Sequence, residues 1–106
     1  MLKVNFFESP INITLTISGG QQIMATNNGK TLFTADPITC IGKLRRIIRE
    51  VSTIANKQFI FHINCAIKDT SVANNIRGYL KSNLELMNST SNCDIKVNAH
   101  LYNIFA

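Results

Sequence analysis

A run of apolar residues near the middle of the chain, KQFIFHINCAIK (residues 57–68), constrains the fold more than any other segment. Side chains alternate between the two faces of a strand, and here apolar residues occupy both sets of positions: Phe59 and Ile63 on one, Ile60 and Ala66 on the other. Short runs of this kind, rich in β-branched and aromatic residues, are typical of a central strand with both faces covered. A buried helix segment is the alternative, but the run is short and polar residues bound it at both ends. We therefore expect a sheet with this segment at its centre.

The N-terminal third of the chain shows the alternation of an antiparallel meander. The clearest strand signal is residues 11–17, in which isoleucine and leucine alternate with polar residues. Gly19-Gly20 and Asn28-Gly29 are signals for two-residue turns, because these residues tolerate positive φ angles. The strands expected around these turns comprise residues 2–7, 11–17, 21–26 and 31–34.

After residue 35 the hydrophobic period changes to that of helices. Asp36-Pro37 predicts a helix start, since Asp is a good N-cap and Pro is favoured at the first helical position, and apolar residues follow at helical spacing as far as residue 55. Asp69 opens a second cluster of capping residues before a second helix. A polar loop, residues 88–92, then leads to a last alternating strand, residues 93–102. The apolar face expected on the second helix comprises Val72, Ile76, Tyr79, Leu80 and Leu86.

Together these elements predict an α+β fold: a mixed sheet with an antiparallel N-terminal meander, followed by helix, strand, helix and strand, with the two helices packed on the sheet. Strands joined through a helix should lie parallel. This order of elements resembles that of the ribonuclease H-like fold, whose enzymes hold divalent metal with carboxylates, one of them in the middle of the first strand. Here strand 11–17 contains no acid, and Glu8 lies only at the end of the alternative first strand. Glu50 and Asp69 can be placed at later positions, but the carboxylate of the first strand, which would be one of the metal ligands, is missing. The resemblance therefore implies topology rather than activity.

Length and charge limit the classes of protein to consider. The 106 residues are the length of one domain, residues 1–106. The formal net charge of +5 favours an acidic partner, such as nucleic acid or an acidic protein surface. A surplus of charge spread over the surface for solubility is the alternative. No segment approaches the roughly twenty apolar residues that span a bilayer, so we expect no membrane partner.

Cysteine usage indicates the compartment. Cys40, Cys65 and Cys93 are odd in number, far apart and without a CxxC pair. We therefore expect reduced, buried thiols in a cytoplasmic protein. Frequent Asn and Ile are typical of an AT-rich genome and suggest a microbial or mobile-element origin.

No set of reactive side chains converges in the sequence. The six acids are scattered, and Asp36 and Asp69 stand where helix caps belong. His62 and Cys65 are three residues apart on a strand, so they point to opposite faces and cannot share a metal, and a zinc site needs three or four ligands. We expect His62 to be a hydrogen-bonded, semi-buried histidine. The sequence predicts no catalytic residue, no metal and no cofactor.

The most suggestive functional feature is a basic face on the two expected helices. Four cations within seven residues of the first helix could neutralise phosphates. A charged outer face is also what any sheet-covering helix shows, and Arg46 can pair with Glu50 at i, i+4. Aromatic residues that could stack on bases are nearly absent, with Phe7 and Tyr102 as the candidates. The candidate binding residues are Lys43, Arg45, Arg46, Arg49, Arg77 and Lys81.

These observations predict a small, intracellular, non-catalytic binding module that acts as a regulator, inhibitor or assembly subunit through protein–protein contact. The protein partner, or a second copy, would pair with an edge strand, and the expected edges are residues 2–7 and 93–102. Nonspecific nucleic-acid binding through the basic face of the first helix is one alternative. A degenerate nuclease-like or unrecognised enzyme that uses Asp69 and His62 is another.

Overall fold

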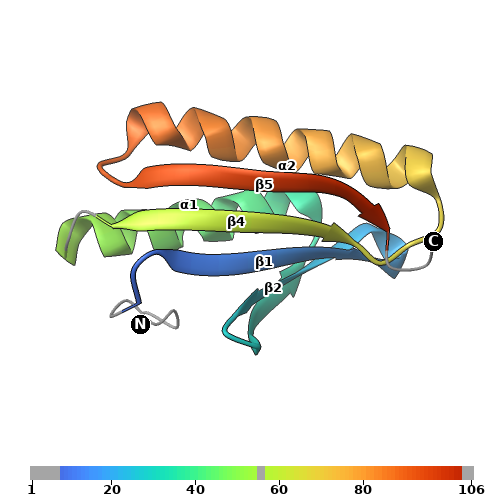
Figure 1. The fold of residues 1–106 in the computed structure, drawn as a ribbon, viewed down its shortest axis with the longest axis horizontal. Helices are drawn as coiled ribbons and strands as arrows, with labels where there is room; N and C mark the ends of the chain where they lie inside the picture. The colour runs from blue at the N-terminus through green and yellow to red at the C-terminus, as the bar shows by residue number, and fades with distance from the viewer. Residues whose placement is uncertain (1–7, 55–56, 104–106) are drawn as a thin grey trace.

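Within the described residues, five strands and two helices follow one another in the predicted order (Figure 1). The computed structural model describes residues 8–54 and 57–103, and the side chains of this part as far as residue 99. The fold is α+β, with two helices packed on a mixed five-stranded sheet. The elements are β1 (Ile11–Ser18), β2 (Gln22–Asn27), β3 (Lys30–Ala35), α1 (Pro37–Ile54), β4 (Gln58–Cys65), α2 (Thr70–Thr90) and β5 (Asp94–Asn103).

The strand order β3-β2-β1-β4-β5 places the apolar strand β4 inside the sheet, between β1 and β5. The meander β1-β2-β3 is antiparallel, whereas β4 pairs in parallel with both of its neighbours. Strands joined through a helix therefore lie parallel, as expected. The prediction that residues 57–68 contain a central strand is confirmed, although the strand itself ends at Cys65.

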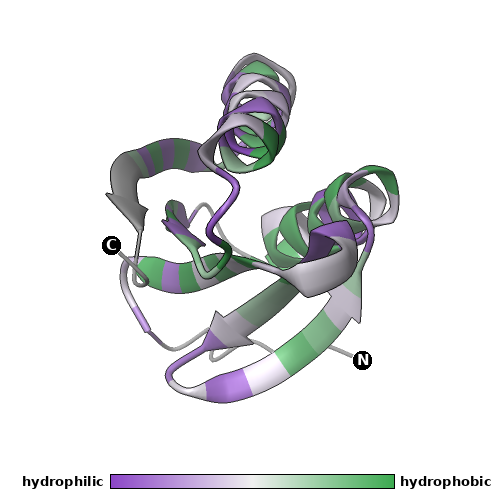
Figure 2. Cartoon of the chain, turned by 90° about the vertical axis from the view of Figure 1, so that its right-hand side faces the viewer, coloured by the Kyte–Doolittle hydropathy of each residue, from purple (hydrophilic) through white to green (hydrophobic). Residues whose placement is uncertain are grey.

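Both helices lie on the same face of the sheet (Figure 2). Each helical crossover steps in the same direction across the sheet, from β3 to β4 and from β4 to β5, so crossovers of the same hand bring both helices to one side. The expectation that both faces of β4 are covered is therefore wrong: Ile60, His62 and Asn64, on the face away from the helices, are only half-buried. The core-facing residues of β1 and β4 are Ile11, Ile13, Leu15, Ile17, Phe59, Phe61 and Ile63.

The two hairpin turns differ from each other. Asn28 and Gly29 both have positive φ, 54° and 79°, and form the expected two-residue turn between β2 and β3. The turn between β1 and β2 has three residues instead of two, because Ser18 pairs with Gln22. Its positive φ angles fall on Gly20 and Gln21, so the prediction of a Gly19-Gly20 two-residue turn is wrong by one position.

Both helices begin at the predicted caps. Asp36 Oδ1 accepts a hydrogen bond from Thr39 N at 3.3 Å, and Pro37 is the first residue of α1. Asp69 caps α2 by accepting from Ser71 N and Val72 N. The carboxylates satisfy backbone N–H groups that have no partner within the helix.

The buried faces of the helices are partly displaced from those predicted. Ile54, expected in the core arc, is 51% exposed at the end of α1. On α2, Tyr79 and Leu86 are 38% and 66% exposed. The helix extends through residues 88–90, which were expected to form a loop. The buried stripe on α2 consists of Ala73, Ile76, Leu80, Leu84 and Met87.

The three cysteines are buried free thiols, as predicted. Burial, together with the charge of Asp36, raises the pKa of Cys40 to about 12, so this thiol is inert at neutral pH. Neither described helix has the length and apolar character needed to cross a bilayer. The expected strand at residues 2–7 lies outside the described residues.

Candidate functional site: the basic face of α1

Lys43, Arg45, Arg46 and Arg49 are all exposed on α1. None of them forms an ion pair with a described residue, and the predicted Arg46–Glu50 pair is not formed. Lys43 has one identifiable neighbour, the ring of Phe33, with Nζ 5.7 Å from the ring centroid. The first helix therefore presents four positive charges that no described carboxylate neutralises.

The two candidate cations on α2 are separate from this face. Arg77 is half-buried, and its Nη1 donates to the carbonyl oxygen of Ala99 in β5 at 3.4 Å, so the prediction that it lies on the outer basic face is wrong. Its Nε is buried and has no hydrogen-bond partner. Lys81 is exposed and pairs with Glu85 at 3.9 Å. The α1 cations remain as candidates: Arg45 and Arg49 line a groove toward α2, and Lys43 lies on the opposite flank of α1, over Phe33.

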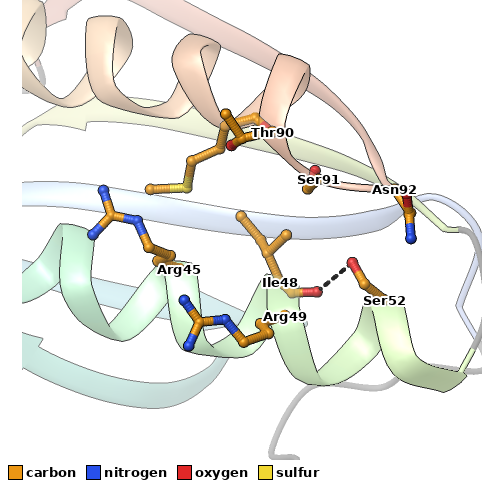
Figure 3. A pocket seen from close by; sticks show the side chains of 8 residues that line it. Arg45, Ile48, Arg49, Ser52, Thr90, Ser91 and Asn92 are labelled. Atoms are coloured by element: carbon orange, nitrogen blue, oxygen red, sulfur yellow. Dashed lines mark hydrogen bonds between the residues drawn. The ribbon is translucent and has the colours of Figure 1, made fainter.

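A groove lies between α1 and the end of α2 (Figure 3). Arg45 and Arg49 line it from α1: the Arg45 side chain points toward α2, and the Arg49 side chain runs along α1. The groove has a volume of about 310 Å³. None of the six acids lines it. Its lining consists of Arg45, Ile48, Arg49, Ser52, Met87, Thr90, Ser91 and Asn92.

The hydroxyl groups of the groove are already used within the protein. Ser52 Oγ donates to the Ile48 carbonyl at 2.8 Å, the hydrogen bond drawn in Figure 3. Thr90 Oγ1 donates to a carbonyl within α2, and Ser91 Oγ donates to the Cys93 carbonyl. The guanidinium groups of Arg45 and Arg49 and the Asn92 amide are therefore the donors that a ligand in the groove would meet.

The groove is electropositive despite its position at the carboxyl end of α2. A helix C-terminus carries the equivalent of about half a negative charge, and α2 has no basic residue in its last turn. Arg45 and Arg49 together carry two positive charges, which is more than the half negative charge at the end of α2. An anion is therefore the ligand that the groove suits electrostatically.

Sequence reasoning identified the arginines but missed the opposite wall. Arg45 and Arg49 are four residues apart and share a helix face, which the sequence shows directly. Thr90, Ser91 and Asn92 had been placed in a loop, and no local pattern indicates that they meet α1.

His62 and Asp69 have structural partners. His62 Nε2 lies 3.0 Å from Asn12 Oδ1, and Nδ1 lies 3.4 Å from Asn98 Nδ2, in a polar row across the open face of the sheet. This confirms the expected hydrogen-bonded, semi-buried histidine. Asp69 is the α2 cap. Within residues 8–54 and 57–103, no three His, Cys, Asp or Glu side chains gather as a metal site would require.

A second depression, of about 630 Å³, lies between the β1–β2 turn, the first turn of α1 and residues 75–79 of α2. It is lined mainly by apolar groups, including Ile38, 71% exposed, and Tyr79. Asp36 is the acid in its lining, and its carboxylate caps α1. The depression therefore lacks the converging polar groups of the groove at Arg45.

Comparison of the chain with protein-family models, with curated proteins and with solved structures returns no match.

Proposed function

We propose that this chain is a non-catalytic binding module that holds nucleic acid by its phosphate backbone on the basic face of α1. The observation that carries the proposal is that Lys43, Arg45, Arg46 and Arg49 are exposed together without a carboxylate partner among the described residues. Unpaired cations on one helix face release condensed counterions when they meet phosphates, and this release supplies most of nonspecific affinity.

The composition of the surface supports binding without base readout. Among the aromatic residues with described side chains, Phe59 and Phe61 are buried and Phe33 lies beneath Lys43. Tyr79 is 38% exposed, but it lines the second depression and not the groove at Arg45. Stacking on single-stranded bases needs exposed rings beside the cations. Contacts to phosphates alone position a strand but carry no sequence information. The proposed binding is therefore independent of sequence.

The test is fluorescence anisotropy with labelled DNA and RNA oligonucleotides at 50 mM and 200 mM salt. Four neutralised phosphates give a slope of roughly −3 to −4 in a log–log plot, so affinity should fall on the order of 100-fold over this range. Arg46→Glu should weaken binding by about tenfold or more at low salt and reduce the slope by at least about 1.

A matched control is Lys96→Glu, which makes the same change in charge on the sheet face away from the helices and should leave affinity nearly unchanged. Absence of binding at 50 mM salt, or equal losses in both variants, would overturn the proposal. Binding of acidic proteins in place of oligonucleotides would reassign the basic face to a protein partner.

Protein contact through a sheet edge is the second proposal, and the position of β5 favours it. This ten-residue strand is one edge of the described sheet, with β4 on its inner side. An unpaired edge offers N–H and C=O groups to an added strand, from a partner or a second copy. The opposite edge strand, β3, has six residues, begins with Lys30 and pairs with β2 through a register shift. These features discourage the addition of another strand at that edge. A dimer mass together with no oligonucleotide binding would favour this role as a regulator, inhibitor or assembly subunit.

A further inference from the structure

We propose that the groove between α1 and the end of α2 captures the terminal phosphate of a nucleic-acid strand, while the other α1 cations hold the adjoining backbone. This inference rests on the proposed nucleic-acid binding and adds a ligand class and a site: a phosphate monoester held by the Arg45–Arg49 pair.

The spacing of the arginine pair on α1 allows both side chains to reach one phosphate. Residues four apart on a helix are surface neighbours, so the two guanidinium groups can reach one anion. Each guanidinium presents a planar fork of donors that binds phosphate oxygens through two parallel hydrogen bonds. Neither side chain has a competing partner among the described residues, and no acid lines the groove.

The charge of the groove favours a monoester over a diester. A phosphate monoester carries about −1.5 to −2 at neutral pH. An internal phosphodiester carries one negative charge per phosphate. Two guanidinium groups opposed by about half a charge from the α2 terminus leave a site of roughly +1.5, which matches the monoester. Because only strand ends carry monoesters, the groove is suited to an end.

The floor of the groove suits the organic part of such a ligand. Ile48 and Met87, which are 2% and 4% exposed, are the apolar residues of the lining. A volume of about 310 Å³ is at the lower end of the range for small-molecule pockets, roughly 300–1,000 Å³, and exceeds the needs of a lone phosphate. A sugar can therefore rest on the apolar floor beside its phosphate, with the Asn92 amide as a further donor.

The experiment compares oligonucleotides of one sequence that carry a 5′-phosphate, a 3′-phosphate or hydroxyl groups at both ends. In anisotropy competition, the wild-type chain should prefer a phosphorylated end by about tenfold, which corresponds to about 1.4 kcal/mol. The preferred end shows whether the groove holds the 5′ or the 3′ end of the strand. The preference should shrink between about pH 7.5 and 5.5, because the monoester has its second pKa near 6 and becomes a monoanion.

The double variant Arg45→Gln, Arg49→Gln should abolish the preference, and Arg46→Gln, the matched control, should weaken binding of all three oligonucleotides equally. Arg45→Lys keeps the charge without the fork and should reduce the preference if the double variant does not fold. Equal wild-type affinity for phosphorylated and unphosphorylated ends would overturn this inference and leave the proposed function intact. A double variant that loses thermal stability but retains the preference would also overturn it, and would show that the two arginines stabilise the C-terminus of α2 and do not bind the phosphate. Failure of every oligonucleotide to bind would overturn both.

Discussion

Glu8 joins the start of β1 to the end of β2. Its Oε1 accepts from Asn12 N at 2.8 Å and from Asn27 Nδ2 at 3.1 Å, and Asn27 is 4% exposed. Burial by itself raises the pKa of Glu8, but the hydrogen bonds from Asn12, Asn28 and Asn27 outweigh it and hold the pKa below its ordinary value of 4.5. A carboxylate with a lowered folded pKa stabilises the native state above its unfolded pKa, and this contribution is lost as pH falls through the folded pKa.

Glu8→Ala should therefore reduce the free energy of unfolding at pH 7 by about 1–3 kcal/mol, since the donors of Asn12, Asn27 and Asn28 lose an acceptor. Urea unfolding measures this directly. The gap between wild type and variant should narrow as pH falls below 4.5. Glu8→Gln, which keeps an acceptor oxygen without the charge, should show a smaller gap at pH 7. This gap should also narrow below pH 4.5, because only the wild type titrates at this position. A Glu8→Ala gap of constant size from pH 7 into the acid range would contradict the assigned hydrogen bonds.

Arg77 shows where residue-level prediction fails. The sequence predicts it to point outward, because the predicted apolar face of α2 includes Tyr79 and Leu86 together with Val72, Ile76 and Leu80, and excludes Leu84 and Met87. The face centred on Leu80 and Leu84 instead turns Arg77 toward β5, where it donates to the Ala99 carbonyl. A long side chain can run along an apolar surface to a distant acceptor, and sequence spacing contains no information about that acceptor.

At the scale of elements, helix starts were predictable and helix faces only partly so. Asp36 and Asp69 act over two or three residues, so local chemistry determines them. The face of α2 depends on which apolar residues meet the sheet, and the helix has more apolar residues than one stripe can bury. A polar residue, Asn83, also lies beside the core on α2. Its Nδ2 donates to the Tyr79 carbonyl at 2.8 Å, and this hydrogen bond satisfies the side-chain amide.

The cap of α2 is open to a direct test. Asp69→Ala should lower the free energy of unfolding by about 1 kcal/mol, because the N–H groups of Ser71 and Val72 lose their acceptor. Asp69→Asn, which also caps helices well, should restore most of the loss. Asp94→Ala is a control at an exposed aspartate whose side chain bonds no described residue, with an expected change within about 0.5 kcal/mol. Equal losses at positions 69 and 94 would show that the cap does not stabilise α2.

At the scale of the molecule, topology followed from the order of elements because strands joined through a helix lie parallel. Coverage of the sheet was predicted wrongly, although the alternation within β4 contains the signal: the core face is apolar throughout, and the open face has one apolar residue, Ile60, beside polar ones. Ile60 stands among His62 and Asn64 there, half-buried without a helix above it. The groove was also beyond prediction: it joins Arg45 to Thr90 and Asn92 across more than forty residues of sequence, and tertiary packing alone brings them together.

The central claim is that α1 and the end of α2 form the nucleic-acid surface, and an amide chemical-shift titration of the ¹⁵N-labelled chain tests it most directly. Addition of a 5′- or 3′-phosphorylated oligonucleotide at low salt should shift the amides of residues 43–49 and 90–92 and leave those of Thr14, Thr16 and His62 in place. Shifts confined to β5 or to the open face of the sheet, or no shifts at saturating oligonucleotide, would contradict the account.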